Sequence, residues 1–398
     1  MKRVLVGVVL LAGCLFWVGD VGATSQFSRK EGISCSACHL GFPRLNEFGE
    51  KYMRAGYRVP DSKSVHAGEK LSLESVSHYL GVRLNVDAVS WEDGNPDSTV
   101  AFGNDKWAQF FVAGNVADKV SFFTEIELTS SNTHYSWWKL GYHGESQKFN
   151  VTVGNQSPVD HSAFSNRLRI LPAVKSELYG LKTSTDGADP DGMGGFDSVS
   201  SVNASSARRG IQGFGDLGHF VYYAGISNGT GDVSDAINWW GGLRWYFPTE
   251  GKLAGSSISA TYYLGSDVYG SGPAQVENEF SWWMPALNIR AGGLDIQAYG
   301  RFVTEDNIGL VLPPTPEVEE DWDGWGLTAG WMINERWQPA IQYDKIDPNT
   351  IIPVTESEWV TVALSYFPLE NLRIAAHYRS DEFVKDNDQF FVNIRMMF

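Results

Sequence analysis

The sequence predicts an all-β fold, a transmembrane outer-membrane β-barrel of about 16 antiparallel strands behind a short N-terminal segment with helical periodicity. Three observations lead to this prediction. Stretches of about ten residues with alternating polarity fill the chain from residue 71 onward. Short and long connections alternate between these stretches. The chain ends in an alternating strand whose last residue is aromatic, Phe398.

Residues 1–23 have the pattern of a secretory signal peptide. A basic start precedes an apolar run at 4–18, and small residues at 21–23 suit cleavage after Ala23. A second interpretation is a lipoprotein box at 11–14, which is disfavoured because the apolar run continues beyond it. After Ala23 no stretch of about 18 residues is uniformly apolar, so we expect no transmembrane helix.

The next segment, 24–68, contains the motif Cys35-Ser36-Ala37-Cys38-His39. In an exported protein, C-x-x-C-H is typical of covalent c-type haem attachment. The two cysteines suit the two vinyl groups of one haem, and the adjacent histidine suits the iron as proximal ligand. The alternative is a small disulfide loop, because no other cysteine follows Ala23. We expect one haem c, with Cys35 and Cys38 as thioethers and His39 on the iron.

The residues after the motif carry an apolar stripe at helical spacing, formed by Leu45, Phe48, Tyr52 and Ala55. We expect this stripe to pack on the haem face. The segment 24–68 is too short for a free-standing cytochrome c fold, so we expect it to pack against the rest of the chain. It is therefore predicted to be a helical, haem-binding plug on a barrel at 69–398.

The alternation within the strands indicates a barrel in lipid. In 119–128, apolar residues at every second position alternate with Ser121, Glu125 and Glu127. A membrane barrel turns the apolar face outward and leaves the polar face in the lumen. The predicted strands are 71–90, 106–117, 119–130, 134–143, 148–155, 208–215, 218–227, 235–247, 255–266, 276–289, 293–304, 321–333, 336–346, 357–367, 371–380 and 387–398.

The connections predict the orientation of the barrel. Periplasmic turns are usually short and external loops long, which places both chain ends in the periplasm and the barrel in the outer membrane among its lipids. The short connections are 117–119, 291–293, 334–336 and 368–370, and the long ones are 91–105, 156–207, 305–320 and 347–356. The last strand and Phe398 resemble the signal read by the barrel assembly machinery, a predicted partner.

Tryptophan-rich pairs suit the aromatic girdles of such a barrel, although ordinary strand packing explains any single pair equally well. These residues are Trp137, Trp138, Trp239, Trp240, Trp282 and Trp283, with Trp325 and Trp331.

Together, the haem motif and the barrel resemble the fused cytochrome–porins of the bacterial outer membrane, which include single-haem iron oxidases. The resemblance lies in 27–57, FSRKEGISCSACHLGFPRLNEFGEKYMRAGY, which follows a family pattern like FPxLNxFGxxFxxxGY after the motif. Tyr52 replaces the Phe usual at its position. The resemblance implies thioethers at Cys35 and Cys38 and a proximal ligand at His39.

The resemblance also implies a function, the movement of electrons across the outer membrane. The electrons would pass from a small extracellular donor such as Fe(II) to a periplasmic c-type cytochrome or another electron carrier. Whether the chain is an Fe(II) oxidase stays open. The alternatives are a porin or transport channel whose haem plug is structural, and electron export to extracellular acceptors.

The sixth ligand of the iron is not fixed by the sequence. Its identity matters because methionine raises the potential of a haem relative to histidine. Lumen-facing positions are predicted for His219 and His377, and the long segment that holds His161 could fold into the lumen. The alternation of its predicted strand points the side chain of His78 to the outer face of the barrel. The candidates are Met53, His66, His161, His219 and His377, ahead of His78, His134 and His143.

The charge of the chain is acidic, with a formal net charge of −16. This argues against nucleic acid as a partner and against attachment to anionic lipid through basic patches. Two acidic clusters on predicted external loops are either solvated loop charge or a means of enriching a cation. The first hints at calcium, although its spacing departs from an EF-hand loop. The clusters are Asp186, Asp189, Asp191 and Asp197, and Glu317, Glu319, Glu320, Asp321 and Asp323.

Overall fold

A computed structural model describes most of the chain. The described residues are 25–60, 76–93, 98–128, 133–174, 208–228, 237–248, 250–269, 276–306, 320–347, 357–381 and 388–398. The predicted signal peptide, His66 and the cluster around Asp186 lie outside them.

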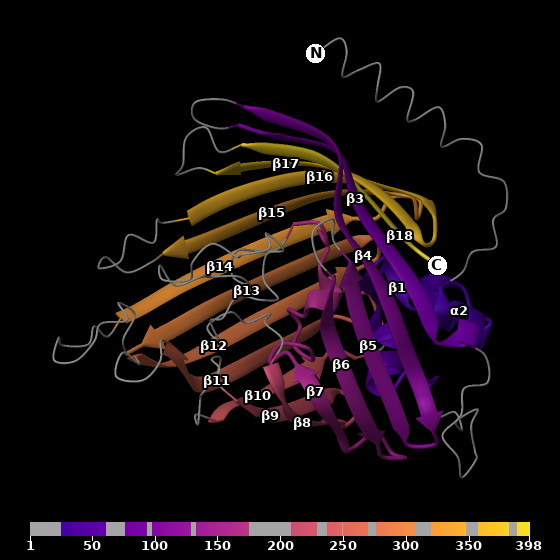
Figure 1. The fold of residues 1–398 in the computed structure, drawn as a ribbon, viewed down its shortest axis with the longest axis vertical. Coiled ribbons are helices and arrows are strands. Elements are labelled where there is room, and N and C mark those ends of the chain that lie inside the picture. Colours follow the sequence, from indigo (N-terminus) through magenta and orange to yellow (C-terminus); the bar gives the residue numbers. More distant parts are fainter. Residues whose placement is uncertain are drawn as a thin grey trace.

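Sixteen strands form one closed barrel in which every strand pairs antiparallel with its neighbours in sequence (Figure 1). The barrel closes where β18 pairs with β3, and two backbone hydrogen bonds of 2.7 and 2.9 Å join Val82 to Phe398. This confirms the predicted fold class and strand number. The strands are β3 (Leu80–Glu92), β4 (Thr99–Ala117), β5 (Val120–Leu128), β6 (Thr133–His143), β7 (Asn150–Gln156), β8 (Arg208–Asp216), β9 (Phe220–Asn228), β10 (Ile237–Tyr246), β11 (Ser257–Tyr269), β12 (Val276–Ala291), β13 (Leu294–Glu305), β14 (Glu320–Trp331), β15 (Trp337–Asp347), β16 (Ser357–Leu369), β17 (Leu372–Asp381) and β18 (Gln389–Met397).

Some predicted strand ends were wrong. The first strand begins at Leu80 rather than at 71, and Val76–His78 form a 3-10 turn before it, so His78 is not a strand residue. The predicted long loop 91–105 is largely strand, because β3 and β4 stay paired as far as Glu92 and Thr99. Glu320, Asp321 and Asp323 likewise belong to β14 rather than to a loop, and Glu317 and Glu319 lie outside the described residues. Pairing with a neighbour, which polarity does not reveal, decides where each strand ends.

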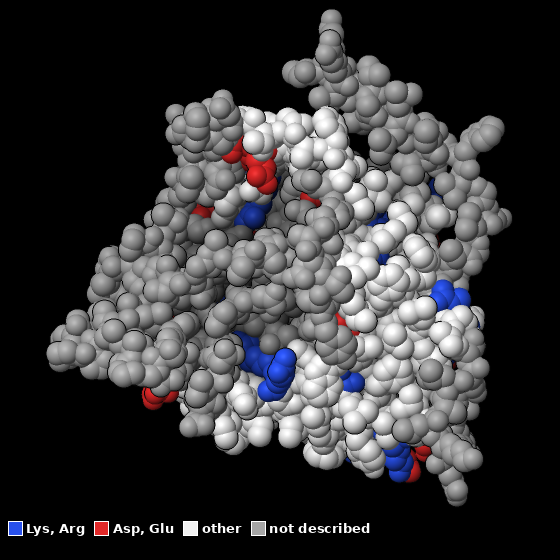
Figure 2. All heavy atoms as spheres, viewed as in Figure 1, with Lys and Arg blue, Asp and Glu red and all other residues white. Residues whose placement is uncertain are grey.

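The outer face of the barrel is apolar and the inner face polar. On β10, Leu243 is exposed while the next residue, Arg244, is buried. Figure 2 shows the same character on the face in view, where charged side chains are sparse over the described strand surface. The aromatic pairs divide by the same alternation, so that Trp239 and Trp283 point outward while Trp240 and Trp282 are buried. One tryptophan of each pair therefore faces outward, as a girdle residue must, and the other packs inside the barrel.

One segment between β7 and β8 folds into the lumen, as the sequence allowed. We call residues 157–174 the inner loop. Its start is held by a hydrogen bond of 2.9 Å from the Ala163 amide to Ser259 Oγ on β11. Its end is held on the opposite wall, where Arg373 and Arg395 each donate to an inner-loop carbonyl at 3.3 Å. The inner loop therefore crosses the barrel interior.

The N-terminal residues 25–60, which we call the plug, sit in one mouth of the barrel (Figure 1). The plug contains α2 (Gln26–Glu31), the 3-10 turn η1 (Cys35–Ala37), the short hairpin β1 (His39–Gly41) and β2 (Arg44–Leu45), and α3 (Glu47–Arg54). Its contacts lie at the rim where β3 begins and β18 ends. At that rim, Arg58 donates to the Asp118 carbonyl between β4 and β5 at 2.9 Å. Within the described residues, no helix is both long and apolar enough to cross a membrane.

Candidate haem-binding site

The cysteine motif sits in a compact local structure. Cys35 begins the turn η1, and the Cys38 amide donates to the Cys35 carbonyl at 3.1 Å. The Cys35 amide donates at 2.9 Å to Glu370 in the turn between β16 and β17, which fixes the motif to the barrel rim. After the hairpin, Asn46 caps α3 by accepting a hydrogen bond of 2.9 Å from the Gly49 amide.

The ring of His39 is held so that one nitrogen remains available. Its Nδ1 lies 3.0 Å from the Pro43 carbonyl oxygen, which can only accept, so Nδ1 carries the proton and donates. The lone pair is then on Nε2, the arrangement that metal-bound histidines usually show. Burial lowers the pKa of His39, which favours the neutral form that binds metals.

Both cysteines and His39 line one cavity of about 580 Å³ between the plug, the barrel wall and the inner loop. Its plug side is largely apolar and aromatic. Phe27 stacks on Tyr57 at a ring separation of 5.2 Å, and Tyr57 stacks on Phe123 of β5 at 6.1 Å. Two further aromatic side chains of the barrel wall, Phe111 and Trp137, close this side. The cavity is therefore open to a flat, mostly apolar group beside the thiols.

The rest of the cavity wall is charged and polar. Its cations are Arg83, Arg167, Arg169 and Arg395, and its carboxylates are Asp87, Glu125, Glu127 and Asp160. Gln109 Nε2 donates to both Glu125 and Glu127, and Arg83 lies 3.7 Å from Glu125. One wall is thus suited to an apolar ring and another to ionised substituents.

Of the candidate sixth ligands, the structure brings only Met53 to this cavity among those whose side chains are described. Met53 lies on α3, so the helix surface faces the cavity at this position. Met397, near the end of β18, also lines the cavity. The sequence analysis did not name Met397 as a candidate ligand. Met397 is next to the last residue, Phe398, and therefore lies at the end of the last strand, on the plug side of the barrel.

The described histidines lie elsewhere. His161 and His377 are buried in the lumen, where they stack on Phe214 and Phe391 at ring separations of 4.5 and 4.6 Å. The lumen-facing prediction is right for His377 and wrong for His219, which lies exposed in the turn before β9. His143 uses both ring nitrogens, one at 2.7 Å from Ser121 Oγ and one at 3.0 Å from the Arg54 carbonyl.

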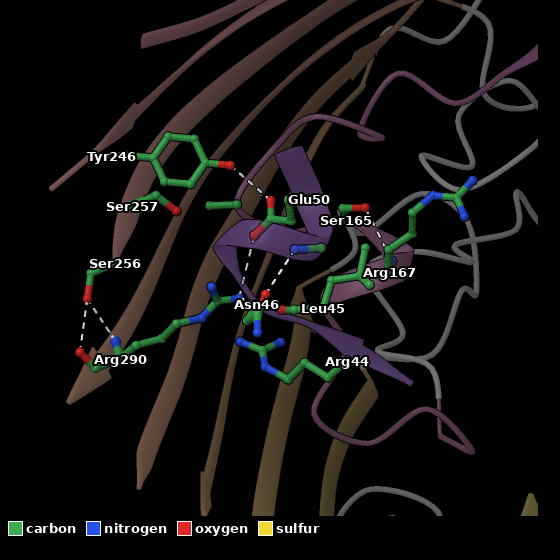
Figure 3. A network of polar contacts seen from close by, with 12 residues as sticks. Arg44, Leu45, Asn46, Glu50, Ser165, Arg167, Tyr246, Ser256, Ser257 and Arg290 are labelled. Carbon is green, nitrogen blue, oxygen red and sulfur yellow. Dashed lines mark hydrogen bonds and ion pairs between the residues drawn. The ribbon is translucent and has the colours of Figure 1, made fainter. Parts of the chain in front are cut away.

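A buried ionic network holds the plug in the barrel mouth (Figure 3). Glu50 of α3 contacts Arg244 in a bidentate arrangement and accepts a hydrogen bond of 2.9 Å from Tyr246. Arg290 and Arg54 lie 3.6 and 3.9 Å from the same carboxylate. Burial by itself raises the pKa of Glu50, but the three arginines outweigh it and lower the pKa to about 2. Glu50 is therefore ionised at neutral pH.

A second ionic contact joins the hairpin to the barrel, where the Arg44 guanidinium forks onto Asp295 of β13. These anchors and the cavity arginines were missed by the sequence analysis. Strand alternation does predict that the charged side chains of Arg244, Asp295 and Arg395 face the lumen. Which inward charges meet the plug depends on how the barrel closes.

Comparisons with known proteins give a fold and no family. No protein-family model and no curated protein matches the chain. Among solved structures, in-vitro folded OmpT, an outer membrane protein of Vibrio cholerae, is 13% identical with a TM-score of 0.54, covering 83% of this chain and 100% of that one. An anion-selective porin from Comamonas acidovorans is 12% identical with a TM-score of 0.56, covering 80% and 99%. At these identities the likeness shows the fold alone, that of a porin-like outer-membrane β-barrel.

Proposed function

We propose that this chain is an outer-membrane barrel that holds one covalent haem c in its plug-side cavity and carries electrons across the outer membrane. The observation that supports it best is the shared cavity of Cys35, Cys38 and His39, with the Nε2 lone pair of His39 free for iron. A cavity of about 580 Å³ falls within the range of about 300–1,000 Å³ common for cofactor sites.

The residues of the cavity fit a haem in chemistry as well as in size. Cys35 and Cys38 would hold it covalently, and His39 would be its proximal ligand, oriented by the Pro43 carbonyl. When bound, the haem supplies one-electron redox chemistry. Phe27, Tyr57 and the aromatic barrel wall exclude water from one side, which with the choice of axial ligand tunes the potential of such a group.

A single haem constrains how electrons cross the membrane. The apolar band of such a barrel is about 25 Å tall, and the cavity adjoins the plug at one rim. A donor must therefore diffuse into the lumen from the opposite mouth, which a small ion such as Fe²⁺ can do. Fe²⁺ would lose one electron and leave as Fe³⁺, and the electron would pass to a periplasmic cytochrome or another carrier at the plug. In this proposal Fe²⁺ is the substrate and not a resident metal of the protein.

The second candidate is a channel whose haem plug is structural. The porin-like fold favours this candidate. Against it, the plug fills one mouth and the inner loop crosses the lumen through its contacts with opposite walls. Solute flux into liposomes separates the two, because an electron-transfer protein needs only a narrow path for its donor.

The test is haem content followed by redox turnover. Cys35→Ala and Cys38→Ala are expected to abolish or severely reduce haem staining on a denaturing gel. Ser36→Ala, between them in the motif, is the matched control and should stain like the parent. Anaerobic mixing of the oxidised parent with Fe²⁺ should reduce the haem bands within the stopped-flow time range. Normal staining of both cysteine variants would refute the proposal. A stained protein with fast solute flux and no reduction would favour the channel.

A further inference from the structure

Two guanidinium groups of the cavity wall, those of Arg167 and Arg395, form no direct ion pair with a carboxylate of the described residues. Arg395 of β18 is 3% exposed, and its Nε and Nη2 donate only to neutral oxygens, of Asn85 at 3.0 Å and Pro172 at 3.3 Å. Arg167 of the inner loop forms no ion pair with any described residue, and its Nε is buried without a hydrogen-bond partner.

The neighbouring acids are engaged by other groups. Asp160 pairs with Lys139, Glu125 lies 3.7 Å from Arg83, and Gln109 bridges Glu125 and Glu127. Asp87 accepts a hydrogen bond of 2.8 Å from Asn393. Burying a cation without a counter-ion is unfavourable by several kcal/mol or more. Asp160 and Glu125 attract Arg167 from beyond ion-pair distance. Arg395 is attracted by Asp87 but repelled by three other arginines. Neither guanidinium is paired directly with a carboxylate of the described wall, so both remain able to bind a further anion in the cavity.

The two cations face the space that the haem motif also lines. Arg167 lies over the Phe123 ring at 5.8 Å, and Arg395 lies over the Trp107 ring at 5.0 Å, so both guanidiniums extend along aromatic faces of the cavity. Figure 3 shows the Arg167 guanidinium turned away from the Glu50 network. Haem c carries two propionate carboxylates on the edge of the ring away from its two thioether bonds.

We propose that Arg167 and Arg395 bind the two propionates of the haem, which makes them the cofactor-positioning residues of the barrel. This inference rests on the proposed function, because it requires the haem. It joins the two halves of the fold, since the plug would hold one edge of the ring through sulfur while β18 and the inner loop hold the other through charge. Guanidinium groups suit carboxylates because their fork geometry allows bidentate hydrogen bonds.

The test uses Arg167→Gln and Arg395→Gln in the holoprotein. Both should keep covalent haem, because the thioethers remain, and both should lower the midpoint potential. A nearby cation disfavours the more positive ferric state, so its removal favours oxidation. We expect the ratio of reduced to oxidised haem at a fixed solution potential to fall roughly tenfold, or about 59 mV for a one-electron couple. Arg395→Lys keeps the positive charge, so its midpoint potential should lie closer to that of the parent than to that of Arg395→Gln.

Arg373→Gln is the matched control. Arg373 pairs with Arg395 in register across β17 and β18, is equally buried and also donates to the inner loop at 3.3 Å, but does not line the cavity. The haem midpoint potential of the Arg373→Gln variant should equal that of the parent. A second measurement is the melting temperature with and without haem, using Cys35→Ala/Cys38→Ala as the haem-free form. The glutamine variants should destabilise the haem form more than the haem-free form.

The outcomes separate this inference from the proposed function. Unchanged potentials in both glutamine variants, with equal destabilisation of the two forms, would overturn the propionate assignment while the haem stays. An equal fall in potential for Arg373→Gln would also overturn it, because the effect would then be a general one of lumen charge. A parent without covalent haem would refute the proposed function and this inference together.

Discussion

Neutralising Glu50 should release the plug from the barrel. Glu50→Gln removes the anion that faces Arg244, Arg290 and Arg54 and leaves three guanidiniums close together in a buried site. Breaking one partner of a buried ion pair typically costs about 3–5 kcal/mol. The lowered pKa gives a similar magnitude, since a change from 4.5 to about 2 corresponds to about 3 kcal/mol at about 1.4 kcal/mol per pH unit.

The same network predicts a pH dependence. Because the pKa of Glu50 is lower in the folded protein than in the unfolded chain, its contribution is fully present above about pH 4.5. It is lost progressively as the pH falls from about 4.5 through about 2. Acid should therefore loosen the plug of the parent in this window, and the Glu50→Gln variant should lack that part of the transition.

Hydrogen exchange of the α3 amides in the detergent-solubilised protein measures this opening. About 3 kcal/mol predicts exchange faster by about two orders of magnitude at neutral pH in Glu50→Gln. Glu47→Gln is the control, because the ion pair of Glu47 among the described residues is with Lys51, at 2.8 Å on the partly exposed helix surface, a contact worth about 0.5 kcal/mol. Equal exchange in the parent and Glu50→Gln would refute the anchoring role.

Three further predictions concern the ligand, the orientation and the donor. If Met53 is the sixth ligand, Met53→Leu should change the absorption spectrum of the haem and lower its midpoint potential. If only Met397→Leu has these effects, Met397 is the ligand instead. Peptide tags within 175–207 should be accessible on intact cells and tags at 334–336 should not, whereas equal labelling would contradict the orientation. Changing the glutamates at 317–320 to glutamine should slow Fe²⁺ reduction at low salt and less at high salt; unchanged rates would remove their role.

The C-x-x-C-H motif depends on local sequence alone. Cys35, Cys38 and His39 adjoin in sequence, so their placement on one side of a cavity follows from a single turn and hairpin. The Pro43 carbonyl that orients His39 is only four positions away. The sixth ligand is a different case, because the sequence leaves both Met53 and His161 open, and only the positions of the plug and the inner loop show that Met53 lines the cavity and His161 does not.

The sequence by itself determined the barrel, its strand number and the cysteine motif, because strand alternation and the C-x-x-C-H spacing depend on residues within one strand or one turn. Only the tertiary structure decided which inward charges meet. Glu50 and Arg244 are 194 positions apart, and Asn85 and Arg395 are 310 apart. Contacts of that kind depend on barrel closure and on the path of the plug and inner loop. A long-range pairing leaves no period in the sequence, since each charged residue alone resembles any other polar residue of the lumen.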